Sequence, residues 1–327
     1  MSRSAAEVSI RRMQPADQAQ VLALIELALG RRPDPRNAAF FAWKHRENAF
    51  GPSPAWVAVD GDRVVGLRTL MRWEFETRDC PVRAVRAVDT ATHPDHQGRG
   101  IFSALTRRAV AELRAEGVDC IFNTPNDKSR PGYLKMGWQP VGRLPTGIRP
   151  ASVTALPRIA NARVPAELWS TSTPAGVSPD EALKDDAAIA RLLGAVAWPP
   201  GVVTRRTAAY LRWRYGFAPL AYRAMLAGSS AEEGLLLYRL RRRGQATELV
   251  VGDLLLPEAA ASAARTLVRA ALRSSGADYA LGLRTTPTSG LLPLPGQGPM
   301  LTWRGLAADS MPPLGEWRLS LGDIELF

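Results

Sequence analysis

Hydrophobic residues in the first 150 positions recur with the period of a strand in some segments and that of a helix in others. In the segment that begins near residue 15, Val21, Ile25 and Leu29 fall on one helical face. Two apolar runs flank Asp60-Gly61-Asp62, a pattern typical of a β-hairpin. Strands are predicted at 8–13, 55–59, 63–75, 84–92, 118–123 and 138–141, with helices at 15–29, 37–47, 101–116 and up to 136. This order predicts a mixed α/β domain, with a central sheet flanked by helices, that ends near residue 150.

The same order of elements recurs in the second half of the chain. Residues 151–200 are rich in Ala, Pro, Ser and Thr and are expected to form a connector with two helices. Beyond it, elements are predicted at 221–226, 235–240 and 247–256 (strands), 257–273 (a helix) and 279–283 (a strand). The aromatic-rich segment 208–215 is expected to pack inward, and no sequence identity is visible between the two copies. We expect two tandem domains of related α/β architecture, residues 1–150 and 201–327, joined by the connector.

Composition and charge are those of a globular protein with a basic surface. Hydrophobic residues make up 46% and charged residues 22%, and 42 basic against 31 acidic residues give a net charge of +11. The densest basic run, Arg241-Arg242-Arg243, precedes Gly244 and is interpreted as a solvated hairpin turn rather than a nucleic-acid contact. Positive charge also favours a polyanionic cofactor, because it attracts phosphates.

Several classes of protein are excluded by what the sequence lacks. Two cysteines, Cys80 and Cys120, are too few for a disulfide framework or a zinc site, so no metal is expected. The first ten residues hold no apolar run typical of a signal peptide. Prolines and glycines interrupt the uncharged stretch 285–303, so a membrane span is not expected there. The expectation is a soluble cytoplasmic protein.

The most informative segment joins the strand that ends at Thr92 to the helix that follows Gly100. Gly98 and Gly100 remove side chains from the backbone just before the helix, and Arg99 adds a charge beside it. Backbone N–H groups and the helix dipole then form an anion site. A glycine turn alone is weak evidence, because most such turns are only tight connections. The segment lacks the third glycine of a Rossmann fingerprint and the Gly-Lys-Ser/Thr of a P-loop.

Two motifs in this region resemble those of the GNAT superfamily of acyl-CoA-dependent N-acetyltransferases. The run 97–102 matches the pattern Gln/Arg-x-x-Gly-x-Gly/Ala at Gln97 and Gly100 and departs from it at Phe102. The second pattern, Asn-x-x-Ala/Ser-x-x-x-Tyr-x-Lys-x-Gly-aromatic, is matched by Asn126, Ser129, Tyr133, Lys135, Gly137 and Trp138. The resemblance covers about the first 150 residues, and a degenerate GNAT-like domain is expected at 201–327.

The resemblance implies acetyl-CoA as co-substrate and assigns the residues that bind it. These are Thr90, Ala91, Thr92, Gln97, Gly98, Arg99, Gly100, Ile101, Phe102 and Asn126. Backbone amides at 98–102 would hold the pyrophosphate, and the backbone at 90–92 would pair with the pantetheine like an added strand. Asn126 could instead cap a helix, and the large Phe102 side chain could crowd the cofactor or turn into the core.

Tyr133 resembles the family's general acid, which protonates the departing thiolate; the alternative is a core tyrosine whose hydroxyl bonds the backbone. The general base is not marked by a motif. Asp89, on the strand that leads to the glycine turn, is the first candidate. Other candidates are Glu74, Glu76, His93 and His96, each of which taken singly is more often a surface or structural residue.

The expected function is transfer of an acetyl group from acetyl-CoA to an amine of a small molecule or peptide, by direct attack in a ternary complex. One alternative is an aminoacyl-tRNA-dependent transferase, because such enzymes also join two domains of this kind. The other is a non-catalytic acyl-CoA-binding module. The sequence does not identify the acceptor, the acyl length or the oligomeric state. Neither a membrane nor a nucleic acid is an expected partner.

Overall fold

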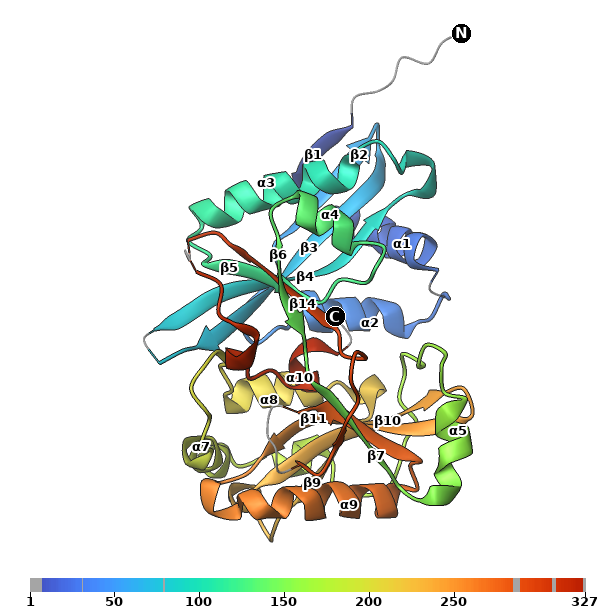
Figure 1. The fold of residues 1–327 in the computed structure, drawn as a ribbon. Coiled ribbons are helices and arrows are strands. Elements are labelled where there is room, and N and C mark those ends of the chain that lie inside the picture. Colours follow the sequence, from blue (N-terminus) through green and yellow to red (C-terminus); the bar gives the residue numbers. More distant parts are fainter. Residues whose placement is uncertain (1–7, 31, 79, 285–288, 308–309, 326–327) are drawn as a thin grey trace.

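The computed structural model of the chain describes residues 8–30, 32–78, 80–284, 289–307 and 310–325. The chain forms two mixed β-sheets, one above the other in the view of Figure 1, and each sheet is flanked by helices. The predicted fold class, two α/β units of related architecture, is confirmed. Within the described ranges, no helix combines the length and the apolar character that crossing a membrane requires.

The first sheet contains eight strands, and β4 and β5 are its one parallel pair among the described pairings. Its order is β1 (Ser9–Arg12), β2 (Ala55–Asp60), β3 (Arg63–Glu76), β4 (Pro81–Thr92), β5 (Cys120–Asn123), β14 (Met300–Gly305) and β6 (Gln139–Arg143), with β8 (Val203–Thr204) paired to β3. The helices of this half are α1 (Gln18–Leu29), α2 (Arg36–His45), α3 (Ile101–Ala115) and α4 (Arg130–Lys135).

The second sheet contains six strands. Its order is β13 (Leu292–Pro293), β7 (Thr146–Pro150), β12 (Tyr279–Leu283), β11 (Ala246–Leu255), β10 (Leu235–Arg243) and β9 (Arg223–Leu226). The accompanying helices are α5 (Leu156–Ala160), α6 (Pro179–Ala182), α7 (Asp186–Ala195), α8 (Ala208–Tyr215), α9 (Ala264–Ser275) and α10 (Leu321–Ile324). Short 3-10 turns lie at Pro15–Asp17, Pro94–His96, Val153–Ala155, Ala218–Leu220, Ala231–Glu233, Glu258–Ala263 and Leu314–Glu316.

The two sheets each contain a strand from the other half of the chain (Figure 1). β7, just before residue 150, pairs with β12 of the second sheet, and β14 lies between β5 and β6 of the first. The ranges 1–150 and 201–327 therefore do not each enclose one sheet. Local apolar patterns indicate that a segment is a strand but carry no information on which sheet it joins.

A short repeat that the sequence analysis missed links α2 and α8. Residues 37–45 read Asn-Ala-Ala-Phe-Phe-Ala-Trp-Lys-His, and residues 207–215 read Thr-Ala-Ala-Tyr-Leu-Arg-Trp-Arg-Tyr. Both helices contribute to one hydrophobic core between the sheets, which contains Trp43, Trp213 and Tyr210. The prediction that the aromatic segment 208–215 packs inward is confirmed.

Helix α3 packs closely on the first sheet, which fixes the position of its amino terminus. Ile101, Leu105, Ala109 and Leu113 are buried on one face, at the predicted spacing of four. A Cβ added at Gly66 of β3 would lie 2.6 Å from Ile101 Cγ2. The missing side chain at position 66 therefore allows the start of α3 to approach the sheet.

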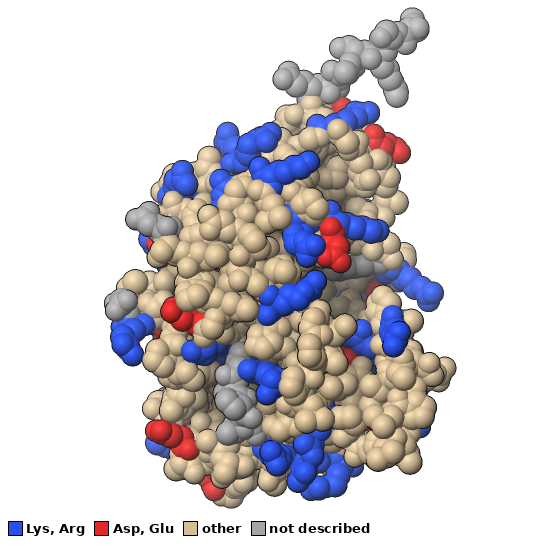
Figure 2. Space-filling model, in the orientation of Figure 1, with Lys and Arg blue, Asp and Glu red and all other residues tan. Residues whose placement is uncertain are grey.

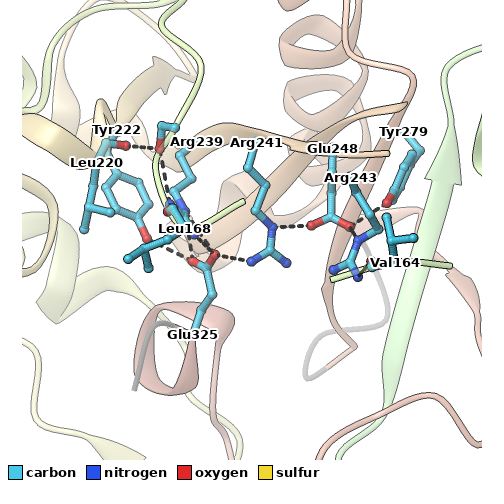
Figure 3. Close-up of polar contacts among 11 residues, drawn as sticks. Val164, Leu168, Leu220, Tyr222, Arg239, Arg241, Arg243, Glu248, Tyr279 and Glu325 are labelled. Atoms are coloured by element: carbon cyan, nitrogen blue, oxygen red, sulfur yellow. Dashed lines mark hydrogen bonds and ion pairs between the residues drawn. The ribbon is translucent and has the colours of Figure 1, made fainter. Parts of the chain in front are cut away.

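Ion pairs connect the carboxyl-terminal segment to the second sheet (Figure 3). Glu325 pairs with Arg239 and Arg241, and Glu248 pairs with Arg241 and Arg243. The predicted hairpin turn after the arginine run is present at Gly244, where φ is +58°. Two of its three arginines, Arg241 and Arg243, are only partly exposed, however, because they pair with buried carboxylates.

Candidate active site

The glycine turn presents open backbone at the head of a fifteen-residue helix. β4 ends at Thr92, and α3 begins at Ile101 with no side chain capping its amino terminus. Gly98 and Gly100 have φ of +76° and +77°, a conformation that favours glycine, and a Cβ at either position would meet nothing within 4 Å. Uncapped N–H groups beside open space can accept an anion such as a diphosphate.

A cavity of about 630 Å³ lies against this turn, between β4, β5, α3 and α4. It brings together eleven of the twelve residues predicted for the site: Asp89, Thr90, Ala91, Thr92, Gln97, Gly98, Gly100, Ile101, Phe102, Asn126 and Tyr133. The twelfth, Arg99, is exposed and is not part of the lining. Figure 2 shows Lys and Arg side chains scattered over one face of the molecule, with fewer acidic side chains between them.

The sheet itself opens at the cavity. β4 and β5 are paired from Ala84 to Arg86 and then separate, so Thr90–Thr92 pair only with β3 among the described strands. Asp89 forms a bulge on β4 with φ +36°, which shifts the register between β3 and β4. The free edge of β4 can therefore pair with an extended ligand.

Tyr133 lies in α4 with its side chain buried and its hydroxyl beside β3. The ring packs edge-to-face against Phe102 and Trp138, and 4% of the residue is exposed. The hydroxyl accepts a hydrogen bond of 2.6 Å from Arg68 Nη1. Phe102 therefore makes two contacts: it lines the cavity, and it packs against the ring of Tyr133.

Arg68 of β3 is a site residue that the sequence analysis missed. It is fully buried, and the same Nη1 donates a 2.6 Å hydrogen bond to Thr90 Oγ1. The sequence feature that could have revealed it is an arginine inside the apolar run Val64–Met71. A charged side chain is rarely buried in such a run unless polar groups compensate for its burial.

Asp89 contacts two buried cationic or titratable groups of α2. Its Oδ2 accepts from Lys44 Nζ and lies 2.9 Å from His45 Nε2. His45 Nδ1 lies 3.0 Å from Ser53 Oγ. Lys44 and His45 were also missed; the signal is a Lys-His pair at the end of a helix whose neighbouring positions are apolar.

The remaining base candidates differ in whether they line the cavity. Among the described residues that line it, His96 is present and Glu74, Glu76 and His93 are not. Glu74 is bonded to Arg205 at 2.7 Å, and His93 Nε2 lies 2.6 Å from Arg63 Nη2. His96 Nε2 lies 2.9 Å from Asp60 Oδ2.

The Asn126 side chain bonds the turn that precedes α4, and α4 itself has no side-chain cap. Its Oδ1 accepts from the backbone N–H of Ser129 at 2.9 Å and from Ser129 Oγ at 3.0 Å. These bonds order the turn that precedes α4 and so help to position Tyr133. Asn126 also lines the cavity, so its place is compatible with the predicted role in binding the cofactor, while the predicted helix cap is not observed.

The corresponding opening in the second sheet is filled. β11 and β12 are parallel from Glu248 to Val250 and then separate, but the cavity beyond them is only about 40 Å³. Asp253, on the wall of that space, pairs with Arg206, and a 3-10 turn without a glycine pair precedes α9. Only the first sheet, within the described residues, combines an opening with a glycine turn.

Comparison with known proteins gives a family match over the amino-terminal part of the chain. Residues 9–141 match the model of the acetyltransferase (GNAT) domain. This part of the chain is a GNAT domain, as the two motifs predicted. No curated protein sequence matches the chain.

Solved structures resemble the whole chain in fold. A GCN5-related N-acetyltransferase from Kribbella flavida is 18% identical, with a TM-score of 0.62 over 93% of this chain and 73% of that one. A probable N-acyltransferase from Enterococcus faecalis V583 is 13% identical, with a TM-score of 0.60 over 92% and 73%. Eis1 from Mycobacterium abscessus is 17% identical, with a TM-score of 0.57 over 91% and 73%. At these identities, the TM-scores show a shared fold.

Proposed function

We propose that the protein transfers an acetyl group from acetyl-CoA to an amine of a small molecule or peptide, in a ternary complex. One observation carries the proposal: the open glycine turn and Tyr133 border the same cavity, at the point where β4 and β5 separate. An anion site and a proton donor in one cavity are what thioester aminolysis needs.

The described residues suit the coenzyme. The uncapped N–H groups at the start of α3 would bind the pyrophosphate, and Gly98 and Gly100 leave the space it requires. The free edge of Thr90–Thr92 would hydrogen-bond the pantetheine. Acetyl-CoA supplies the thioester, and this chain supplies the groups that hold it and move protons.

The chemistry follows from two residues that line the cavity, Tyr133 and Asp89. The amine nitrogen attacks the thioester carbon, a C–N bond forms, and the C–S bond breaks with its electron pair left on sulfur. Tyr133 donates its phenol proton to that sulfur. The proton lost by the amine passes to Asp89.

Asp89 is supported as proton acceptor by its position. It is the one carboxylate among the described residues that line the cavity. Its bulged backbone turns it out of the regular strand, and His45 and Ser53 continue a chain of hydrogen bonds behind it. A carboxylate so connected can take up a proton and pass it on.

The test is a screen of amines with acetyl-CoA that follows the release of free thiol. For an accepted amine, Tyr133→Phe and Gly100→Glu are expected to lower the rate, the first through kcat and the second through the KM for acetyl-CoA. Matched controls are Tyr238→Phe, a buried tyrosine of the second sheet, and Gly276→Glu, at φ +67° with open space around it. Rates equal to the parent for both site variants contradict the proposal. Tight coenzyme binding with no thiol release for any amine favours a non-catalytic acyl-CoA-binding module.

A further inference from the structure

Arg68 is a buried cation that forms no ion pair with any carboxylate among the described residues. None of its surface is exposed, and its Nε and Nη2 have no hydrogen-bond partner in the part of the chain that the structure describes. Two other buried arginines pair with carboxylates, Arg206 with Asp253 and Arg239 with Glu325. The buried Arg86 and Arg214 donate to backbone carbonyl oxygens. Burial of an unpaired charge is unfavourable, so a purely structural explanation for Arg68 is weak.

The two hydrogen bonds that Arg68 does make both lead to the cavity. Its Nη1 lies 2.6 Å from the Tyr133 hydroxyl and 2.6 Å from Thr90 Oγ1. A guanidinium only donates, so both oxygens must accept there. The phenol O–H therefore points away from Arg68.

Packing restricts the remaining directions for this proton. Phe102 and Trp138 lie edge-to-face against the Tyr133 ring, with centroids 5.4 and 5.1 Å away. Tyr133 lines the cavity, which leaves the cavity as the side where its proton can find an acceptor. The guanidinium carbon of Arg68 also lies 5.2 Å from the centre of the same ring.

We propose that Arg68 is a positioning residue for acyl transfer, acting through Tyr133. It directs the phenol proton toward the departing sulfur and stabilises the charge left on the phenol oxygen. As the C–S bond breaks, its electron pair goes to sulfur, the Tyr133 proton moves to that sulfur, and the negative charge moves to the phenol oxygen beside Arg68. Solvent then returns a proton to Tyr133. Because no carboxylate in the described part of the chain pairs with Arg68, its charge is available to this oxygen. The inference rests on the proposed function.

Removal of the Arg68 charge should lower activity without lowering stability. Arg68→Met keeps much of the aliphatic side chain and removes an unpaired buried cation. The melting temperature of this variant is expected to equal or exceed that of the parent, and its affinity for coenzyme A to stay within about twofold, while kcat falls about tenfold or more at an unchanged KM for acetyl-CoA. Arg68→Lys is expected to recover part of kcat. Arg239→Met serves as the control, because it removes one of the two arginines that pair with the buried Glu325 and should lower the melting temperature.

A double-mutant cycle with Tyr133→Phe tests the route through Tyr133. Once the phenol is absent, adding Arg68→Met should change kcat by less than about twofold, because its effect passes through that hydroxyl. Independent losses that multiply, or a melting temperature that falls together with kcat, overturn the positioning role and leave the proposed function intact. A parent that releases no thiol with any amine overturns both.

Discussion

Trp43 and Trp213 donate hydrogen bonds to each other's backbone. Trp43 Nε1 lies 2.7 Å from the Trp213 carbonyl oxygen, and Trp213 Nε1 lies 2.8 Å from that of Trp43. Their rings are stacked with centroids 5.4 Å apart. The two residues occupy the same position in the repeated helices α2 and α8, so the pair joins the two halves of the chain symmetrically. It also holds α2, whose next residues, Lys44 and His45, contact Asp89.

The reciprocal bonds should contribute strongly to stability. Trp213→Phe removes one donor and leaves the buried Trp43 carbonyl without it, and the smaller ring leaves a cavity. We expect the free energy of unfolding to fall by about 2–4 kcal/mol, measured by urea denaturation. Trp138→Phe is the control, because Trp138 Nε1 has no hydrogen-bond partner among the described residues. Equal losses at positions 138 and 213 would mean that the indole bonds contribute nothing.

Gly66 should control how closely α3 approaches the sheet. A Cβ there would lie 2.6 Å from Ile101, the first residue of α3, and 3.1 Å from Leu105. Gly66→Ala is expected to cost about 1–3 kcal/mol of stability by overpacking. The same change should weaken coenzyme A binding, because it displaces the head of the helix. Gly194→Ala, in α7 with nothing within 4 Å, is the control and should be neutral or stabilising. Unchanged coenzyme affinity for Gly66→Ala contradicts this view of the site.

Glu325 should make stability depend on pH in the acid range. Burial raises its pKa, but Arg239 and Arg241 lower it more, so the net pKa lies below its ordinary value of 4.5. The stabilisation from this carboxylate is therefore fully present above pH 4.5, and it is lost as the pH falls through the lower pKa of the folded state. Chemical denaturation at pH 7 should show a loss of about 3–5 kcal/mol for Glu325→Ala, which leaves Arg239 unpaired.

The pH dependence separates charge from packing at this position. The difference in unfolding free energy between the parent and Glu325→Gln should be largest at neutral pH and shrink as the pH falls below 4.5. Denaturation curves at a series of pH values measure it. A difference that stays constant down to the acid limit indicates that the charge of Glu325 is irrelevant.

The two thiols should differ sharply in reactivity. Burial raises the pKa of Cys120 to about 12, whereas Cys80 is exposed. Since the thiolate is the reactive form, iodoacetamide at pH 8 should label one thiol per folded chain and two after unfolding. Mass spectrometry counts the labels, and Cys80→Ser should give none in the folded protein. Rapid labelling of that variant would show that the core around β5 opens.

The open glycine turn at the head of α3 could be predicted from the sequence because its parts are contiguous. A strand, a turn with Gly98 and Gly100, and a helix follow one another within a few residues, so their spacing alone implies their geometry. The position of Tyr133 could be predicted for the same reason, since one short sequence pattern contains both Tyr133 and Asn126.

Residues that reach the site through strand pairing and helix packing could not be predicted. Arg68 approaches Tyr133 only because β3 pairs with β4 under α4, and Lys44 reaches Asp89 only because α2 packs on the bulged strand. The position of β14 between β5 and β6 depends on pairing over about 180 residues, which no local pattern encodes. Long-range strand pairing and helix packing therefore bring Arg68 and Lys44 to the predicted site residues Tyr133 and Asp89.

Calorimetric titration with coenzyme A tests the central claim, that the open turn at the head of α3 holds the diphosphate. The parent and Gly276→Glu should bind coenzyme A with the same affinity. Gly100→Glu should show no measurable heat, because its carboxylate would occupy the anion site and its side chain would strain the backbone there. Equal binding by all three proteins, or no binding by the parent, would contradict the account.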